Sequence, residues 1–180
     1  LLMDDDCFLP GIRRTVSDNA LSATLECDDA VSGDILNLRN GIDRNNVTYG
    51  KEDYRVTLPQ NAAVTYTLEK AAVLQNLHLQ FDTDLDRKTL EGSYVDRLRS
   101  MRSNRTPDSI AVHLPQTLIK GYRITAVTET GEEQTVYETD CNVVGCVNHP
   151  LPKVPLKSIS FIPCETWGSK EIRIFSFDVR

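Results

Sequence analysis

The chain has 180 residues, enough for one domain with a sizeable core, and its 40% hydrophobic and 26% charged residues are ordinary for a folded protein. The net charge of −6 disfavours nucleic-acid binding, which requires a basic surface. No apolar run approaches the roughly 20 residues needed to cross a bilayer, so we expect no membrane span.

The first segment, residues 1–22, differs from the rest of the chain. Apolar residues surround an acidic run at positions 4–6, and Pro10 and Gly11 interrupt any helix there. The start carries neither a signal peptide nor an initiator Met, so we expect a piece of a longer protein. The sequence predicts that residues 1–22 are a tail or linker from a preceding domain and that residues 23–180 form the domain.

From residue 23 onward, short segments alternate apolar and polar residues, with Pro and Gly between them. Successive side chains on a strand point to opposite faces, so this pattern predicts strands with one buried and one wet face. The clearest are 63–68 and 77–85, and the others are 23–26, 35–38, 54–58, 110–114, 122–127, 134–138, 156–162 and 171–179. Gly131 is placed for a hairpin turn between the expected strands 122–127 and 134–138. The sequence therefore predicts an all-β jelly-roll sandwich.

Residues 87–105 break the strand pattern. They hold six basic residues against two acidic ones, and Tyr94, Leu98 and Met101 have helical spacing. The segment is interpreted as a basic insertion with a short helix. It is either a solvated surface or a patch that docks an anion or another part of the protein.

Two clusters of residues suggest metals without completing a site. One cluster is Cys141, Cys146 and His149, which lacks the fourth ligand of a structural zinc site. The chain has five cysteines in all, and this odd number does not indicate a disulfide framework. Asp82, Asp84 and Asp86 alternate as in a calcium loop, but the positions that should hold Gly and Glu are Arg87 and Ser93. Two hypotheses stay open here. In one, calcium binds in another geometry; in the other, Asp82 and Asp84 cap loop N–H groups and pair with Arg44, Arg87 or Arg105.

No catalytic motif is present in the sequence. A nucleophile elbow and a phosphate-binding glycine loop are both missing. His78 and His113 alternate with core positions and are expected to be exposed to solvent. The only tryptophan, Trp167, either plugs one end of the core or offers a platform for a sugar ring.

Several motifs together resemble a known domain family. They are Gly-Ile-Asp-Arg at 41–44, Leu-Pro-Gln at 58–60, residues 77–87 around Phe-Asp-Thr-Asp-Leu, Thr-Trp-Gly at 166–168, and the strand 172–178. With these motifs, residues 20–180 resemble the C-terminal galactose-binding-like (discoidin-type) β-sandwich domain of bacterial FAD-dependent oxidoreductases of uncharacterised substrate. Many such domains carry a Trp just before Leu-Pro-Gln; residues 50–54 have none, so no sugar platform is expected there.

The resemblance implies that FAD belongs to a flavin domain upstream, that this chain binds no FAD by itself, and that its compartment is periplasmic or extracellular. One hypothesis is a non-catalytic accessory module that binds carbohydrate through its end loops. Its candidate ligand-binding residues are polar groups around one aromatic side chain, namely Arg44, Asp84, Asp86, Arg105, Asn142 and Trp167. The alternative is a structural module that packs on the flavin domain and shapes its substrate entrance.

Overall fold

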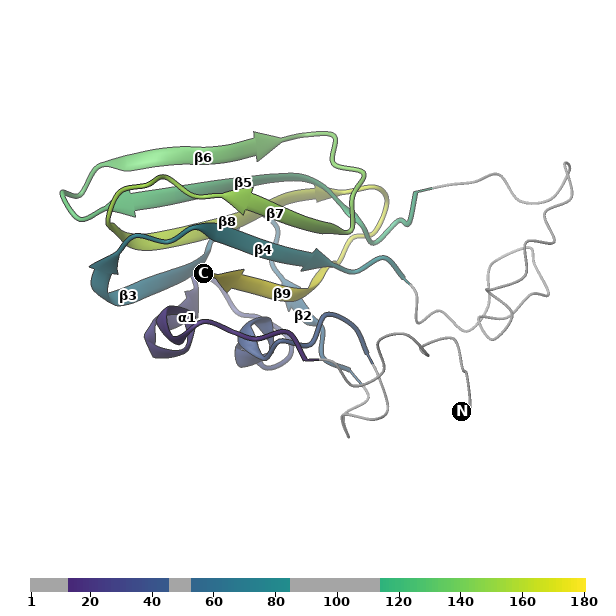
Figure 1. Ribbon diagram of the computed structural model, residues 1–180. Coiled ribbons are helices and arrows are strands. Elements are labelled where there is room, and N and C mark those ends of the chain that lie inside the picture. Colours follow the sequence, from purple (N-terminus) through teal and green to yellow (C-terminus); the bar gives the residue numbers. More distant parts are fainter. Residues whose placement is uncertain (1–12, 46–52, 85–113) are drawn as a thin grey trace, which may run out of the picture.

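The computed structural model describes residues 13–45, 53–84 and 114–180, and these residues form two antiparallel sheets packed face to face (Figure 1). The first sheet has the order β1 (Thr24–Cys27), β3 (Val64–Ala72), β8 (Leu156–Thr166), β5 (Ile119–Thr128) and β6 (Glu133–Thr139). The second has the order β2 (Val56–Leu58), β9 (Ile172–Val179), β4 (Asn76–Phe81) and β7 (Cys146–Pro150). The all-β sandwich predicted from the sequence is confirmed.

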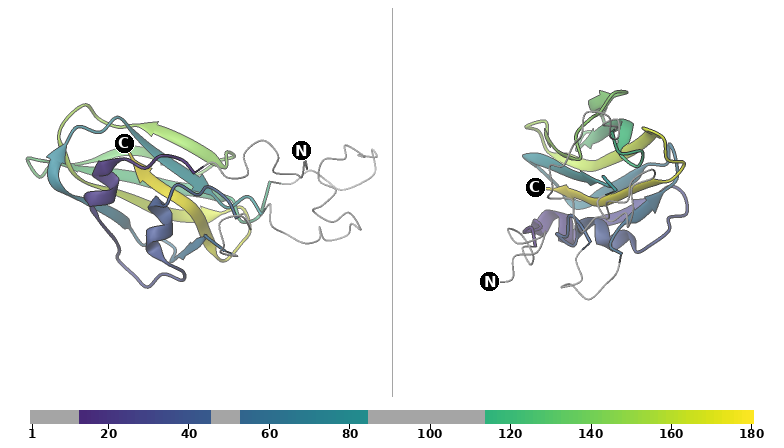
Figure 2. Two further views of the ribbon diagram at one scale, coloured as in Figure 1. Left: turned by 60° about the horizontal axis from the view of Figure 1, so that its bottom comes forward. Right: turned by 90° about the vertical axis from the view of Figure 1, so that its right-hand side faces the viewer.

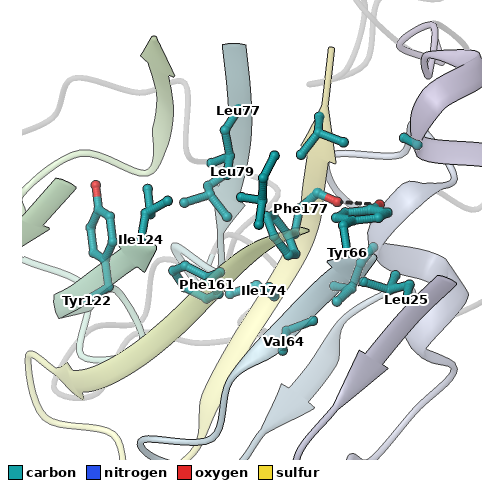
Figure 3. Close-up of a cluster of buried hydrophobic side chains, with 14 of the residues drawn as sticks. Leu25, Val64, Tyr66, Leu77, Leu79, Tyr122, Ile124, Phe161, Ile174 and Phe177 are labelled. Atoms are coloured by element: carbon teal, nitrogen blue, oxygen red, sulfur yellow. Dashed lines mark hydrogen bonds between the residues drawn. The ribbon is translucent and has the colours of Figure 1, made fainter. Parts of the chain in front are cut away.

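The core lies between the two sheets and is built by the inward-facing residues of each strand (Figure 3). Tyr66 and Phe177 meet edge to face with ring centroids 4.9 Å apart, and Phe161 lies 5.9 Å from Phe177. The hydroxyl of Tyr66 donates to the carbonyl oxygen of Phe177 at 2.8 Å, so this buried polar group is paired. Burial raises the pKa of Tyr66 far above its usual value.

Two elements differ from the prediction. Residues 35–38 are not a strand but part of a 3₁₀ helix, η1 (Ile35–Arg39). The reason is the cap: the Asp34 carboxylate accepts from the N–H of Leu36 at 3.0 Å, which favours a helical turn over extended backbone. Strand β7 was not predicted, because Asn148 and Pro150 interrupt its apolar pattern. The strand predicted at 110–114 and the basic insertion 87–105 lie outside the described residues, apart from Leu114.

Residues 13–22, which the sequence assigns to the tail, pack on the sandwich. They include α1 (Asp18–Ser22), whose N-cap Ser17 accepts from the N–H of Ala20 at 3.2 Å. Ala20 is fully buried in the main core, and α1 contacts β3 and β9. The left view of Figure 2 shows α1 and η1 beside β9, on the side of the molecule turned toward the viewer. This part of the predicted tail therefore belongs to the folded body.

We call residues 13–17 the strap. The N–H of Arg14 donates to the carbonyl of Gly41 at 2.8 Å, and the Ser17 hydroxyl donates to the carbonyl of Val179. A Cβ at Gly41 would lie 2.2 Å from the carbonyl oxygen of Arg14, so the strap passes directly over this glycine, which has φ +77°. The strap thus ties the residues around Gly41 to the end of β9.

The outer face of the four-stranded sheet is also covered. Phe175 points away from the main core and packs with Ile42 and Tyr54 in a second apolar cluster. On the same face, His78 is only 6% exposed. The expectation that His78 faces away from the core is right, but the expectation that it meets solvent is wrong, because residues from the segment 13–45 lie over it. In the described ranges no helix is long and apolar enough to cross a membrane.

Candidate binding site at one end of the sandwich

One end of the sandwich collects most of the polar residues singled out in the sequence. The antiparallel pairing places the ends of β4, β6 and β8 beside the starts of β5, β7 and β9. The connecting residues 82–84, 114–118, 140–145 and 167–171 therefore come together, and we call them the loop end (right-hand side of Figure 1).

Asp82 follows β4 directly and is 1% exposed. Its Oδ2 lies 2.9 Å from Nε of Arg173 and 3.3 Å from Nη1 of Arg55, and its Oδ1 accepts from the N–H of Asp84 at 2.8 Å. Asp53 binds the other side of the Arg55 guanidinium at 2.7 Å. The predicted cap on loop N–H groups is thus present, but the arginine partners seen here are Arg55 and Arg173.

Asp84 and Arg44 lie near this ion-pair group. Asp84 adopts φ +57°, a left-handed conformation that the bond from its N–H to Asp82 helps to hold. Arg44 lines a small pocket of about 30 Å³, together with Asp82 and Thr83. This volume holds about one water molecule. Asp86 and Arg105, the other two charged candidates, lie outside the described residues.

Asn142 and Trp167 are brought into direct contact. The indole Nε1 donates to the backbone carbonyl of Asn142 at 2.7 Å. The Asn142 amide donates to the carbonyls of Ile119 at 2.8 Å and Val144 at 3.0 Å, and its Oδ1 accepts from the N–H of Val144 at 3.2 Å. With 8% exposure, Asn142 fixes the shape of the loop 140–145.

Trp167 is partly buried and packs against the main core. Lys120 places its ammonium 5.6 Å from the indole centroid and pairs with Glu165 at 3.1 Å. Between the two hypotheses for this residue, these contacts favour the plug over an open platform.

Two apolar side chains stand out on the loop that Asn142 fixes. Val143 is 55% exposed and Val144 is 48% exposed. Thr83, the residue after Asp82, packs tightly against Gly145 in this loop. A Cβ added at Gly145 would lie only 2.5 Å from Cγ2 of Thr83. Thr117 donates to the carbonyl of Asp82 at 3.1 Å from the neighbouring segment. The loop end is therefore one contiguous surface with an apolar and a charged part.

The residues of the zinc hypothesis are not brought together. Cys141 and Cys146 are exposed, whereas His149 is buried and its Nε2 lies 2.9 Å from the hydroxyl of Tyr122. Burial lowers the pKa of His149. Across the residues that the structure describes, no group of three or more His, Cys, Asp or Glu side chains is arranged to hold a metal ion.

Sequence reasoning missed Arg55, Arg173, Lys120 and the two exposed valines. The signal for Arg173 was its outward position on the last strand, but its pairing with Asp82 depends on how β9 and β4 align. Nothing in the sequence indicated that Val143 and Val144 are exposed. Their exposure depends on the conformation of the loop backbone, which the hydrogen bonds of Asn142 fix.

No protein-family model and no curated protein matches the sequence. The fold, however, is similar to solved structures of carbohydrate-binding modules. A family 32 module from Streptococcus pneumoniae EndoD has a TM-score of 0.59 at 12% identity, covering 91% of this chain and 99% of that one. A chitosan-binding module from Paenibacillus sp. IK-5 has a TM-score of 0.57 at 11% identity, covering 91% and 98%.

A third similar structure is the family 32 module of Clostridium perfringens NanJ in complex with galactose. Its TM-score is 0.56 at 11% identity, with 91% of this chain and 97% of that chain covered. At these identities the likeness establishes the fold. The chain therefore has the galactose-binding-like jelly-roll fold of these modules.

Proposed function

We propose that this chain is a non-catalytic carbohydrate-binding module whose ligand rests on the loop end. The observation that carries the proposal is the match of nearly the whole chain to carbohydrate-binding modules, one of them solved with galactose and another bound to GalNAc. Because one fold serves many functions, the chemistry of the loop end has to support the proposal as well.

The chemistry of the loop end suits a sugar. A pyranose ring has an apolar face of C–H groups and a rim of hydroxyls, and binding sites for such ligands combine apolar surface with a few fixed polar groups. Val143 and Val144 supply exposed apolar surface on a loop that is already held in place. Arg44 and Asp84 are the described candidates for the hydroxyls, and Asp86 and Arg105 stay predictions.

Asn142 and Trp167 have a supporting role in this proposal. The polar atoms of the Asn142 side chain bind backbone groups of Ile119 and Val144, and the Trp167 N–H binds Asn142. Their contribution is to keep the apolar loop rigid, so that little conformational entropy is lost on binding.

The parent protein is a separate proposal. That the chain follows an FAD-binding domain, works with it as a partner and resides in the periplasm or outside the cell rests on the sequence resemblance alone. Purely structural packing on such a domain is the alternative function.

The deciding experiment is a thermal-unfolding screen of this chain against neutral, acidic and amino sugars, each with calcium and with a chelator. A ligand that binds only the folded state, at 100 times its Kd, adds about 2.7 kcal/mol to the unfolding free energy. A shift with one sugar class supports the proposal and names the ligand class. A flat screen contradicts it and favours the structural alternative, and a shift with calcium alone revives a calcium site.

The variants for this test use the two ends of the sandwich. The double change Val143→Ser and Val144→Ser removes apolar surface from the loop end, and we expect it to weaken sugar binding about tenfold or more. Val73 and Val154 are 56% and 40% exposed at the opposite end, so Val73→Ser with Val154→Ser is the matched control and should leave binding unchanged. Equal affinity in all three proteins would exclude the loop end as the site.

A further inference from the structure

Tyr137 differs from the other Phe, Tyr and Trp side chains of the described residues, because it is 38% exposed while they are buried or partly buried. It lies on β6, the last strand of the five-stranded sheet, two residues before the strand ends at Thr139. β7 is the last strand of the other sheet on the same side of the sandwich (Figure 1). We call the side formed by β6 and β7 the flank.

A β-bulge sets the direction of the Tyr137 side chain. In the pairing of β5 with β6, Ile124 lies opposite Tyr137 and Thr125 lies opposite Thr135, so Val136 has no partner on β5. An extra residue of this kind bends an edge strand and re-aims its side chains. Here Val136 packs against the main core, whereas the ring of Tyr137 reaches a side chain of β7. The ring therefore bridges the edges of the two sheets.

Two buried side chains hold the Tyr137 ring from its inner side. Its centroid lies 4.0 Å from that of His149, at an interplanar angle of 32°, and 5.6 Å from that of Tyr122. His149 and Tyr122 are 9% and 1% exposed, and the His149 Nε2 lies 2.9 Å from the Tyr122 hydroxyl. The exposed part of Tyr137 is accordingly its outer side. Since the ring is already held in place, binding on that side costs little conformational entropy.

An aromatic ring that is held on one side and exposed on the other suits a sugar. The apolar C–H face of a pyranose packs on such a ring, and neighbouring polar groups bind its hydroxyls. In the described ranges β7 is paired only with β4, so backbone N–H and C=O groups on its other edge are available to a ligand. Thr139 adds a hydroxyl two residues along, on the same side of β6 as Tyr137.

The charges on the flank narrow the class of sugar. The charged residues of β6 are Glu133 and Glu138, and β7 has no charged residue. Arg123 of β5 lies opposite Glu138, and alternation places both on the other face of the sheet from Tyr137. The two strands thus offer no cation to the carboxylate of an acidic sugar, which favours a neutral one.

We infer that the outer side of Tyr137 is a second carbohydrate subsite, which takes a neutral sugar ring. The inference rests on the proposed carbohydrate-binding function and extends it to a surface outside the loop end. Residue 140, where the loop end begins after β6, is three residues beyond Tyr137, about 10 Å along an extended chain. A sugar chain that occupies the loop end can therefore place a further ring on Tyr137, and the first contact raises the effective concentration for the second.

The test is an NMR titration of the 180-residue chain, with ¹⁵N in the backbone and ¹³C in the tyrosine rings. The probes are galactose, N-acetylgalactosamine, glucose and mannose, with glucuronic acid as the acidic comparison. At least one neutral sugar should shift the ring signals of Tyr137 and the amide of Asn148 with the same Kd, and glucuronic acid should shift neither. The amide of Gly131, in the turn before β6, is the internal control and should not move.

Two variants test the aromatic ring itself. Tyr137→Leu keeps an apolar side chain but removes the ring, and should weaken the binding that the Asn148 amide reports by about tenfold. Tyr137→Phe keeps the ring and should bind about fivefold or more tightly than Tyr137→Leu. Equal affinity of the two variants would overturn the inference. If Tyr137→Leu does not fold, the ring signals of the wild-type chain still decide the question.

The amides of Val143 and Val144 separate this inference from the proposed function, because they report on the loop end. Shifts at these amides with Tyr137 unmoved would overturn the second subsite and leave the loop end as the site. Shifts at Tyr137 without shifts at the valines would support the second subsite and contradict the loop end as the site. A set of neutral sugars that moves neither contradicts both.

Discussion

Asp82 is a buried carboxylate shared by two arginines, and its neutralisation should be costly. In Asp82→Asn the guanidinium groups of Arg55 and Arg173 lose their common counter-charge inside the fold. We expect a loss of about 2–4 kcal/mol in unfolding free energy, somewhat below the range for fully buried pairs because both guanidinium groups reach solvent. Urea unfolding measures this loss.

Asp53→Asn is the control for Asp82→Asn, since Asp53 binds the same Arg55 but its side chain is 50% exposed. Its cost should stay below about 1 kcal/mol. Equal costs for the two variants would show that burial of Asp82 does not set the strength of the network.

Trp167 provides a second prediction at this scale. Trp167→Ala removes partly buried ring area and the bond to Asn142, and should cost about 2–4 kcal/mol. Trp167→Phe keeps an aromatic ring but loses the N–H donor, and should cost about 1 kcal/mol. Thermal unfolding followed by circular dichroism distinguishes them. An alanine variant with wild-type stability would mean that the indole does not plug the end.

Single side chains were the least predictable part of the molecule. The sequence correctly indicated that Asp82 caps a loop, since this depends on neighbours in the chain. Its arginine partners are distant in sequence: Arg173 lies on β9 and Arg55 lies just before β2. Asn142 and Trp167 were both selected for their residue type and were found in contact.

At the scale of elements, the strap depends on one glycine. Gly41→Ala would add the strain of φ +77° and a clash with the carbonyl oxygen of Arg14, which belongs to backbone and cannot rotate away. We expect either a loss of about 3 kcal/mol in unfolding free energy or release of the strap from the sandwich, whichever costs less free energy. Unfolding free energy and hydrogen exchange at Arg14 report the two outcomes.

Gly131→Ala is the matched control for this change. Gly131 has a similar φ of +87°, but nothing lies within 4 Å of an added Cβ. Its cost should be about 1–2 kcal/mol, from backbone strain alone. If both alanine variants lose the same amount, the strap does not press on Gly41.

Elements were predictable where alternation was clean and flanking Pro or Gly marked the ends, as in β3 and the β5–β6 hairpin. The segment 35–38 was misassigned because Ile-Leu-Asn-Leu is apolar enough for a strand, while its conformation follows from the cap at Asp34. The burial of His78 could not be read from its own strand, since residues far away in sequence cover that face.

At the scale of the whole molecule, stability should fall in acid for two reasons. Burial lowers the pKa of His149 and so favours its neutral form. Its contribution to the unfolding free energy is therefore complete above the pKa of about 6.5 that it has in the unfolded chain, and declines below that pH. Burial alone would raise the pKa values of Asp43 and Asp53, but hydrogen bonds from neighbouring groups, among them Arg14 for Asp43 and Arg55 for Asp53, outweigh burial and lower both pKa values. Their contribution is present above an unfolded pKa of about 3.9 and is lost as pH falls through the folded values.

Urea unfolding of the wild-type chain and of His149→Gln across this range tests the first part. The variant should show a flatter decline between about pH 6.5 and pH 5, with the steeper loss near pH 4 retained. Identical slopes would assign the first decline to another group.

The sandwich as a whole could be predicted because its alternating pattern recurs in strand after strand, so one wrong or missed element did not change the fold class. The candidate binding site could not be predicted in the same way, because the loops that form it are positioned by pairings between distant strands. The resemblance to the C-terminal domains of oxidoreductases agreed with the structure on the fold only.

The position of Trp167 has a practical consequence. Because the chain has a single indole and that indole is bonded to the loop 140–145, intrinsic fluorescence reports on the loop end without interference from other tryptophans. A sugar that reorganises this loop would change the wavelength or intensity of the emission. The protein therefore contains its own optical reporter, and a titration can be followed with no label attached.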